Sequence, residues 1–242
     1  KSSAYLDGKG VPDARVAAVG FLGGLEMANF RRMKLMAVEK GIVDRLLASV
    51  IFILSIPFFV FVPMLIKLTS KGPVLYKAKR LGKNGRTIYV WKFRSMYADA
   101  DKRLDALLAS DPSLKAEFEK DFKLKNDPRV TPLGKFLRKT SIDELPQLFN
   151  VWSGDMSFVG PRPERPEIYN EICKTFPEFR YRLVVKAGLT GYAQIYGKYN
   201  TTAIDKLKLD LIYIKKYSFY KNRKFITRII IKFNRKIFFW NS

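Results

Sequence analysis

The stretch LLASVIFILSIPFFVFVPMLI, from Leu46 to Ile66, decides the fold class of this chain because it contains no charged side chain. Arg45 and Lys67 flank it directly. About 20 consecutive apolar residues are enough to cross a lipid bilayer as an α-helix. The stretch therefore predicts a segment that enters a membrane.

Two prolines, Pro57 and Pro63, interrupt this apolar stretch. Proline lacks a backbone N–H, and its ring clashes with the carbonyl one turn earlier, so a straight helix is disfavoured. Lys and Arg are abundant on both sides of the stretch, and cytoplasmic flanks are normally the basic ones. We therefore predict a re-entrant helix over residues 34–69 that breaks near Pro57 and returns to the cytoplasmic face. A single ordinary span is the alternative that the sequence leaves open.

The composition agrees with a protein that works at a membrane surface. The 242 residues carry 45 Lys and Arg against 22 Asp and Glu, a formal net charge of +23. This excess suits anionic lipid headgroups or phosphate-bearing substrates. It also suits nucleic acid, so a non-enzymatic basic module that binds membranes or nucleic acid is the alternative function.

Cysteine and histidine usage restricts the chemistry that the chain can perform. Cys173 is the only cysteine and there is no histidine. These counts exclude a disulfide framework within the chain and remove the commonest general base. Acid–base or metal chemistry must therefore use carboxylates, Lys, Tyr or water.

The part of the chain that follows the membrane segment mixes strand and helix patterns, which predicts an α/β fold. Alternating side chains indicate short strands over 73–97 around a turn at Gly82–Gly85. Two helices are expected over 98–122, the second with Asp111 as N-cap and Pro112 at its first position. The other expected helices are a short amphipathic one over 143–152 and one over 203–217.

Side chains that could carry chemistry concentrate in VWKFRSM (90–96) and GKFLRKTSIDELPQLFNVWSGDMSFVGPRP (134–163). The second stretch contains the adjacent carboxylates Asp143 and Glu144 at a predicted helix start. A structural interpretation also fits these acids, because Ser141 and Glu144 have the spacing of a capping box. Asp143 would then be a first-turn acid favoured by the helix dipole.

Arg162 stands between Pro161 and Pro163, two residues with fixed φ angles. One interpretation is a rigid turn whose guanidinium is only solvated. The other is a bidentate grip on a phosphate, for which a planar, pre-oriented guanidinium is well suited.

These blocks resemble the bacterial sugar transferases, the monotopic phosphoglycosyl transferases that start glycan assembly on polyprenyl phosphate. The matching blocks are KFRSM, DFKLKNDPRVTPLGKFLRKTSIDELPQLFNVWSGDMSFVGPRP, GLTGYAQ and LDLIYIKKYS, which together span most of residues 43–219. The insert ASDPSLKAEFEKDFKLKNDPRV looks most like the branch that transfers hexose-1-phosphate in O-antigen, capsule or exopolysaccharide synthesis.

The resemblance implies an activity, a location and a set of partners. A sugar-1-phosphate would pass from a UDP-sugar to polyprenyl (undecaprenyl) phosphate through a covalent aspartyl-phosphosugar intermediate, with release of UMP. The enzyme would lie in the bacterial inner membrane, with its catalytic domain on the cytoplasmic face. Its partners would be the UDP-sugar, polyprenyl phosphate and membrane lipids; a homodimer is allowed for, and no nucleic acid is expected.

The resemblance also implies roles for individual residues. Asp143 and Glu144 would form the catalytic dyad, with Asp143 as the nucleophile and as the residue nearest to Mg²⁺. Pro57 would break the membrane helix. The residues at motif positions that would contact phosphate are Arg94, Arg138 and Arg162.

The implied organisation has four parts. They are an N-terminal segment of unassigned role (1–33), the re-entrant helix (34–69), a membrane-embedded catalytic domain with interfacial amphipathic helices (70–220) and a basic amphipathic tail (221–242). The chain departs from the family pattern at Ile56, where Ser often precedes the breaking proline, although Ser55 stands one residue earlier. Lys186 also stands where the family usually has Arg, and the two are not equivalent at a bidentate site.

Overall fold

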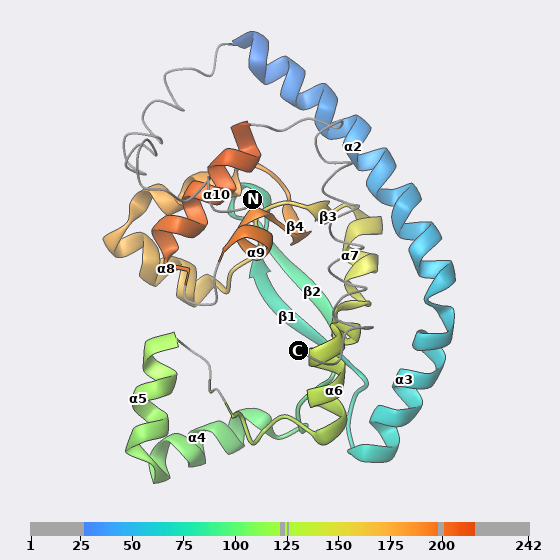
Figure 1. Cartoon of the computed structure of the whole chain (residues 1–242), viewed down its shortest axis with the longest axis vertical. Helices are drawn as coiled ribbons and strands as arrows, with labels where there is room; N and C mark the ends of the chain where they lie inside the picture. Colours follow the sequence, from blue (N-terminus) through green and yellow to red (C-terminus); the bar gives the residue numbers. More distant parts are fainter. Residues whose placement is uncertain (1–26, 122–123, 125, 198–200, 216–242) are drawn as a thin grey trace. The chain divides into compact units, whose positions relative to one another are not determined.

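The computed structural model describes residues 27–121, 124, 126–197 and 201–215 (Figure 1). Most of the segment 1–33 and the whole of the 221–242 tail lie outside these residues, and the four-part division stays a prediction. The described chain forms two compact units. The first comprises 27–46, 79–88 and 151–215, and the second comprises 47–78 and 89–150.

A broken helix carries the apolar stretch. Helix α2 (Met27–Leu54) is followed by α3 (Ile56–Thr69), and the two are bent by 61° at the break (Figure 1). Pro57 cannot donate to the carbonyl of Ile53, and the Ser55 hydroxyl donates to the carbonyl of Ile51 at 2.6 Å. The predicted break near Pro57 is therefore confirmed. Among the described helices, none alone has the length and apolarity of a membrane span, whereas this bent pair together meets both criteria.

Helix α3 has one face in a hydrophobic core and another that the protein leaves uncovered. Val62 and Ile66 pack against Phe93, Leu137 and Ile142. The exposed apolar side chains around the bend are Val50, Ile53, Leu54, Ile56, Phe58, Val60, Phe61, Met64, Leu65 and Leu68. The apolar stretch is thus only partly used for packing within the protein.

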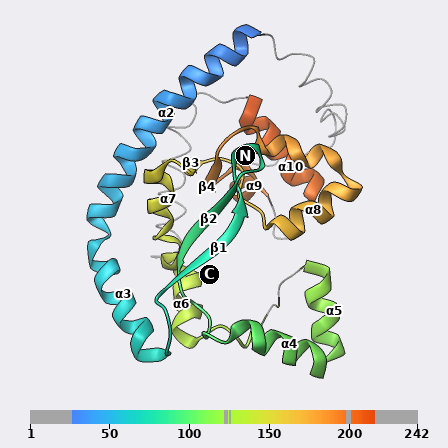
Figure 2. The same cartoon turned by 180° about the vertical axis from the view of Figure 1, so that it is seen from behind.

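The predicted strands form a hairpin of β1 (Leu75–Leu81) and β2 (Thr87–Phe93), which run side by side in both views (Figures 1 and 2). The one-turn helix η2 (Lys83–Gly85) joins them, with Asn84 and Gly85 at φ angles of 56° and 76°. The predicted turn is therefore confirmed.

The next helices also follow the sequence pattern. Helix α4 (Ala100–Ser110) is followed by α5 (Pro112–Asp121), and the Asp111 carboxylate accepts from the backbone N–H of Ser113 at 2.8 Å. Asp111 therefore caps α5, as predicted.

Helix α6 (Pro132–Thr140) lies directly against the end of the hairpin. The Thr131 hydroxyl caps it by accepting from the N–H of Gly134 at 2.9 Å. A Cβ on Gly134 would stand 1.9 Å from the carbonyl oxygen of Ser95, so only glycine permits this approach.

The helix expected over 143–152 is divided in two. A 3₁₀ turn, η3 (Ile142–Glu144), precedes α7 (Gln147–Ser153). The physical reason is Pro146, which has no N–H to donate to the carbonyl of Ile142. The N–H of Leu145 bonds to that carbonyl instead, at 3.1 Å, and closes the tighter turn. Gly154, at φ 86°, follows α7.

In the first unit, β3 (Met156–Val159) pairs in parallel with β4 (Ala187–Thr190). Helix α10 (Ala203–Lys215) confirms the helix expected at 203–217 as far as the described residues extend. It packs against α9 (Tyr192–Tyr196) and against η4 (Pro177–Val184). Helix α8 (Pro166–Thr175) also packs on η4. The fold is therefore mixed α/β, as predicted, and mostly helical.

Candidate active site

The acidic pair lies in η3 of the second unit. Helix α6 ends at Thr140, and Ser141 adopts a left-handed conformation with φ 62° that reverses the chain into η3. An N-cap residue requires an extended backbone, and the Ser141 side chain makes no capping hydrogen bond. The capping-box interpretation is therefore wrong. Asp143 is 6% exposed, and Glu144 is half-buried.

Lys92 of β2 forms ion pairs with both carboxylates. Its Nζ lies 2.8 Å from Oε1 of Glu144 and 3.9 Å from Oδ2 of Asp143. Because Ile88 and Val90 are buried on the same side of β2, strand alternation carries Lys92 to the inner face. Lys92 was not predicted as a site residue, although its position two residues after Val90 in a strand indicates that its side chain lies on the buried face.

Asn150 of α7 fixes the edge of β2 beside the acidic pair. Its Oδ1 accepts from the N–H of Trp91 at 3.0 Å, and its Nδ2 donates to the carbonyl of Tyr89 at 2.7 Å. The buried side chain thus pairs with a backbone N–H and a backbone carbonyl of β2, as a neighbouring strand would do. Asn150 was not predicted as a site residue, and its isolated position in the motif gave no signal for a partner in β2.

The acidic pair fits a Mg²⁺ ion only together with a ligand that brings further oxygens. Among the described residues, no three Asp, Glu, Cys or His side chains gather around one point. Asp143 and Glu144 nevertheless share one cation already, the ammonium of Lys92. Mg²⁺ is commonly held by one or two carboxylates and substrate phosphates, and this donor set has that character.

Arg138 of α6 is the predicted phosphate contact that lies in electrostatic reach of the pair. Its Nε donates to the hydroxyl of Ser95 at 2.8 Å. Partial burial lowers the pKa of Arg138, and the charge of Asp143 opposes that shift. The structure therefore brings together Lys92, Arg138 and the acidic pair.

Arg94 is engaged elsewhere in the second unit. Its guanidinium donates to the carbonyls of Ser70 and Lys71 at 2.7 and 2.8 Å, and to the Ser70 hydroxyl at 2.8 Å. The side chain is buried. These bonds hold the chain that leaves α3, and the predicted phosphate contact of Arg94 stays a prediction.

The Pro-Arg-Pro turn belongs to the first unit, and its backbone is pinned on several sides. The carbonyl of Pro161 accepts from the N–H of Gly188 at 2.9 Å, and the N–H of Gly160 donates to the carbonyl of Thr190 at 2.8 Å. The carbonyl of Arg162 accepts from Arg182 at 3.0 Å, while the Arg162 residue itself is exposed. A rigid backbone thus presents an accessible residue, and its phosphate contact stays a prediction.

An ion network around the buried Arg182 supports this turn. Arg182 pairs with Asp210 at 2.9 Å and with Glu164 at 3.5 Å. Burial raises the pKa of Asp210 to about 6, against the opposing effect of Arg182. Burial alone would raise the pKa of Glu164, but Arg182 and Lys206 bring it below its ordinary value. Both acids therefore pair with Arg182 and hold it in place.

The chain matches one family model and several characterised proteins. Residues 35–236 match the family described as "Bacterial sugar transferase". The undecaprenyl-phosphate galactose phosphotransferase of Salmonella typhimurium is 41% identical over 180 residues, which cover 74% of this chain and 37% of that protein. The UDP-glucose:undecaprenyl-phosphate glucose-1-phosphate transferase of Klebsiella pneumoniae is 39% identical over 202 residues, covering 81% and 40%.

A shorter relative is matched over most of its length. The exopolysaccharide production protein ExoY of Sinorhizobium fredii is 36% identical over 184 residues, 75% of this chain and 79% of that protein. The chain spans less than half of the length of the Salmonella and Klebsiella relatives.

Proposed function

This chain belongs to the bacterial sugar transferase family, and from that premise we propose that it transfers a sugar-1-phosphate from a UDP-sugar to undecaprenyl phosphate. The observation that carries the proposal is the acidic pair Asp143–Glu144, which Lys92 holds within the part of the chain that the family covers. The names of the Salmonella and Klebsiella relatives support the donor and acceptor classes.

The first step is a displacement at phosphorus. A carboxylate oxygen of Asp143 attacks the β-phosphorus of the UDP-sugar. The bond from that phosphorus to the bridging oxygen breaks, and UMP leaves with the electron pair, so that an aspartyl-phosphosugar intermediate remains. The low exposure of Asp143, at 6%, supports this role because a poorly hydrated carboxylate is a stronger nucleophile.

The second step returns the carboxylate. A phosphate oxygen of undecaprenyl phosphate attacks the same phosphorus, the bond to Asp143 breaks, and undecaprenyl-diphosphate-sugar leaves. The acceptor is already ionised, so no general base is needed, which agrees with the absence of histidine from the chain. Two displacements in sequence replace one difficult exchange.

The charges of the site oppose the repulsion between an anionic nucleophile and an anionic donor. Lys92 neutralises part of the acidic pair, and Arg138 and Arg162 contact phosphate oxygens. Asp143, together with oxygens of the donor, would hold Mg²⁺, which would supply further charge neutralisation as a Lewis acid.

We further propose that the α2–α3 pair is a re-entrant membrane element with both ends on the cytoplasmic face. The 61° bend and the uncovered apolar side chains around it support this arrangement. Exposed Phe136 on α6 and Trp152 on α7 support contact of these helices with the interface. A nucleotide-sugar donor made in the cytoplasm then reaches the site without crossing the membrane.

A UMP-release screen tests the activity. The full chain in detergent or nanodiscs is incubated with a panel of UDP-sugars, undecaprenyl phosphate and Mg²⁺, and reactions without acceptor serve as the control. We expect UMP release with acceptor-dependent turnover for a restricted set of donors. Salt-sensitive binding of oligonucleotides with no UMP release from any donor would instead favour the basic binding module.

Cysteine labelling tests the membrane arrangement. Lys40 is buried, so the probe is placed at exposed Glu39, with a second probe at Lys71, each in a Cys173→Ser background. Both Glu39→Cys and Lys71→Cys should be protected from an impermeant thiol reagent in intact cells. Labelling at position 39 but not at position 71 would show a single span. Replacing Pro57 and Pro63 with Leu should straighten the helix and expose position 39.

A further inference from the structure

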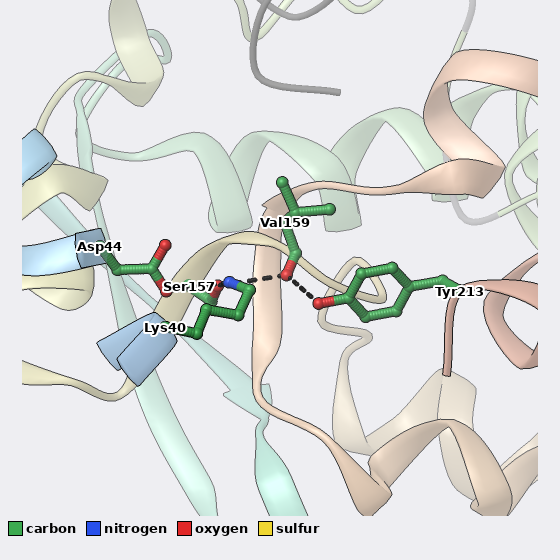
Figure 3. A network of polar contacts seen from close by, with 5 residues as sticks. All are labelled: Lys40, Asp44, Ser157, Val159 and Tyr213. Carbon is green, nitrogen blue, oxygen red and sulfur yellow. Dashed lines mark hydrogen bonds and ion pairs between the residues drawn. The ribbon is translucent and has the colours of Figure 1, made fainter. Parts of the chain in front are cut away.

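A buried polar network joins α2, β3 and α10 in the first unit (Figure 3). Lys40 Nζ lies 3.0 Å from the Asp44 carboxylate and also donates to the hydroxyl of Ser157. The Ser157 Oγ lies 2.6 Å from Oδ2 of Asp44. On the other side, the hydroxyl of Tyr213 donates to the carbonyl of Val159 at 2.6 Å. The network thus reaches the end of β3 from two helices.

The cost of burying these groups indicates that their geometry matters. Lys40 is 6% exposed, Asp44 7% and Ser157 3%. A buried ion pair is often no more stabilising than apolar residues of the same volume, so stability alone is a weak reason for it. Such a pair can instead fix the relative position of the elements that carry it, because each hydrogen bond constrains the two groups that it joins.

The hydrogen bonds act on one short strand. A hydroxyl has one proton, so Ser157 donates to Asp44 at 2.6 Å in preference to the Val159 carbonyl at 3.1 Å. The Val159 carbonyl then accepts from Tyr213. Both ends of the segment 157–159 are therefore held by side chains from outside the sheet.

The turn that carries Arg162 begins at the next residue. Val159 is in register with Thr190, and the N–H of Gly160 donates to the carbonyl of Thr190 at 2.8 Å. A shift of β3 along its own axis would therefore move the whole Gly160–Pro163 turn.

We propose that Lys40, Asp44 and Ser157 are positioning residues that set the place of Arg162 relative to α2, the helix that leads into the apolar stretch. This inference rests on the proposed function, in which Arg162 contacts donor phosphate. Through the network, the part of α2 that lies in the first unit and the phosphate-contacting turn keep one fixed geometry.

A double-mutant cycle tests whether Ser157 acts through Arg162. Ser157→Ala removes the hydroxyl and leaves the Lys40–Asp44 pair in place. We expect it to raise the donor KM on the order of tenfold in the wild-type background, because a displaced contact loses binding and alignment. In an Arg162→Ala background the same change should leave the donor KM unchanged. An equal rise in both backgrounds would overturn the proposal. Tyr89→Phe, which removes an exposed hydroxyl, is the control.

Amide hydrogen exchange gives a readout that needs no activity. Ser157→Ala should speed exchange at Gly160 and Gly188, whose N–H groups bond to the carbonyls of Thr190 and Pro161, while exchange in α8 stays at the wild-type rate. Uniformly faster exchange across the first unit, or no change at the turn, would overturn the proposal. A chain with no UMP release from any donor would refute the proposed function separately, because the exchange result stands without it.

A second variant separates positioning from stability. Lys40→Met combined with Asp44→Leu removes both charges at similar volume, so the midpoint of thermal unfolding should be maintained or raised. The donor KM should still rise on the order of tenfold, and exchange at the turn should still increase. A stable double variant with wild-type KM and wild-type exchange would overturn the proposal.

Discussion

Two carboxylate–cation pairs of this protein have the same chemistry but opposite surroundings. Arg182 and Asp210, in the first unit, meet at 2.9 Å with side chains that are 2% and 1% exposed. Lys92 and Glu144, in the second unit, meet at 2.8 Å with side chains that are 21% and 22% exposed. The first pair is sealed and serves the fold, whereas the second can exchange partners with a ligand. Access, rather than charge, separates a structural ion pair from a reactive one.

Removal of the Asp143 carboxylate should have the largest effect. Asp143→Asn should abolish turnover, because an amide cannot act as the anionic oxygen nucleophile. Stability should change little, because Lys92 still pairs with Glu144. Incubation with radiolabelled donor and no acceptor should label only the wild type.

Asp101→Asn, which neutralises an exposed acid in the first turn of α4, serves as the matched control for this substitution. Turnover by Asp143→Asn at the rate of this control would remove Asp143 from the mechanism.

Disruption of the buried Arg182–Asp210 pair should lower the free energy of unfolding rather than the activity. Asp210→Ala leaves the Arg182 guanidinium buried without the carboxylate oxygen that accepts from its Nε and Nη2, which costs about 3–5 kcal/mol. Denaturant unfolding should report this loss, while kcat per folded molecule at saturating donor should stay close to wild type. If Asp210→Ala instead kept its stability and lost its turnover, the contrast between the two pairs would be reversed.

Lys92 offers a sharper test of the open pair. Lys92→Gln should lower kcat by roughly 10- to 100-fold, because the adjacent carboxylates lose a charged hydrogen-bond donor worth roughly 1.5–3 kcal/mol. It should also lower the Mg²⁺ concentration needed for half-maximal rate, because the two carboxylates without the Lys92 charge attract a divalent cation more strongly.

Lys77→Gln is the control for this change. Lys77 lies 4.4 Å from the centre of the Trp91 ring, so the substitution removes the same charge from the same hairpin without contact to the acids. Equal losses in the two variants would mean that only the overall charge matters.

The smallest of these effects is expected at the Pro-Arg-Pro turn. Arg162→Lys keeps the charge but loses the planar fork, and roughly a tenfold loss in kcat/KM is expected, equivalent to about 1.4 kcal/mol. Arg165→Lys, in the exposed N-cap of α8, provides the comparison. Normal activity for Lys with failure of Ala at position 162 would show that charge suffices.

The parts of the fold that depend on neighbouring residues alone could be predicted from the sequence. The break near Pro57 and the capped helix at Asp111 were predicted because each depends on a residue and its immediate neighbours. The capping box at Ser141 failed because the chain reverses there, and a left-handed serine has no sequence signature.

The candidate site was predictable in its acids and not in their partners. Asp143 and Glu144 stand adjacent in a recognisable block, but Lys92 reaches them from a strand far away in sequence. The same limit applied to Lys40 and Ser157, because their contact depends on how α2 packs on β3. Side-chain partnerships across the fold are set by packing, which single-sequence patterns do not encode.

Gly134 shows how a residue without functional groups can govern a reaction. Its hydrogen faces the carbonyl of Ser95, and a methyl group there would force α6 away from the end of the hairpin. Arg138 is on that helix and bonds to the Ser95 hydroxyl, so the displacement would reach the guanidinium directly. In a genetic screen for loss of function, Gly134 substitutions would therefore be recovered among the active-site alleles, although glycine itself has nothing to offer a substrate.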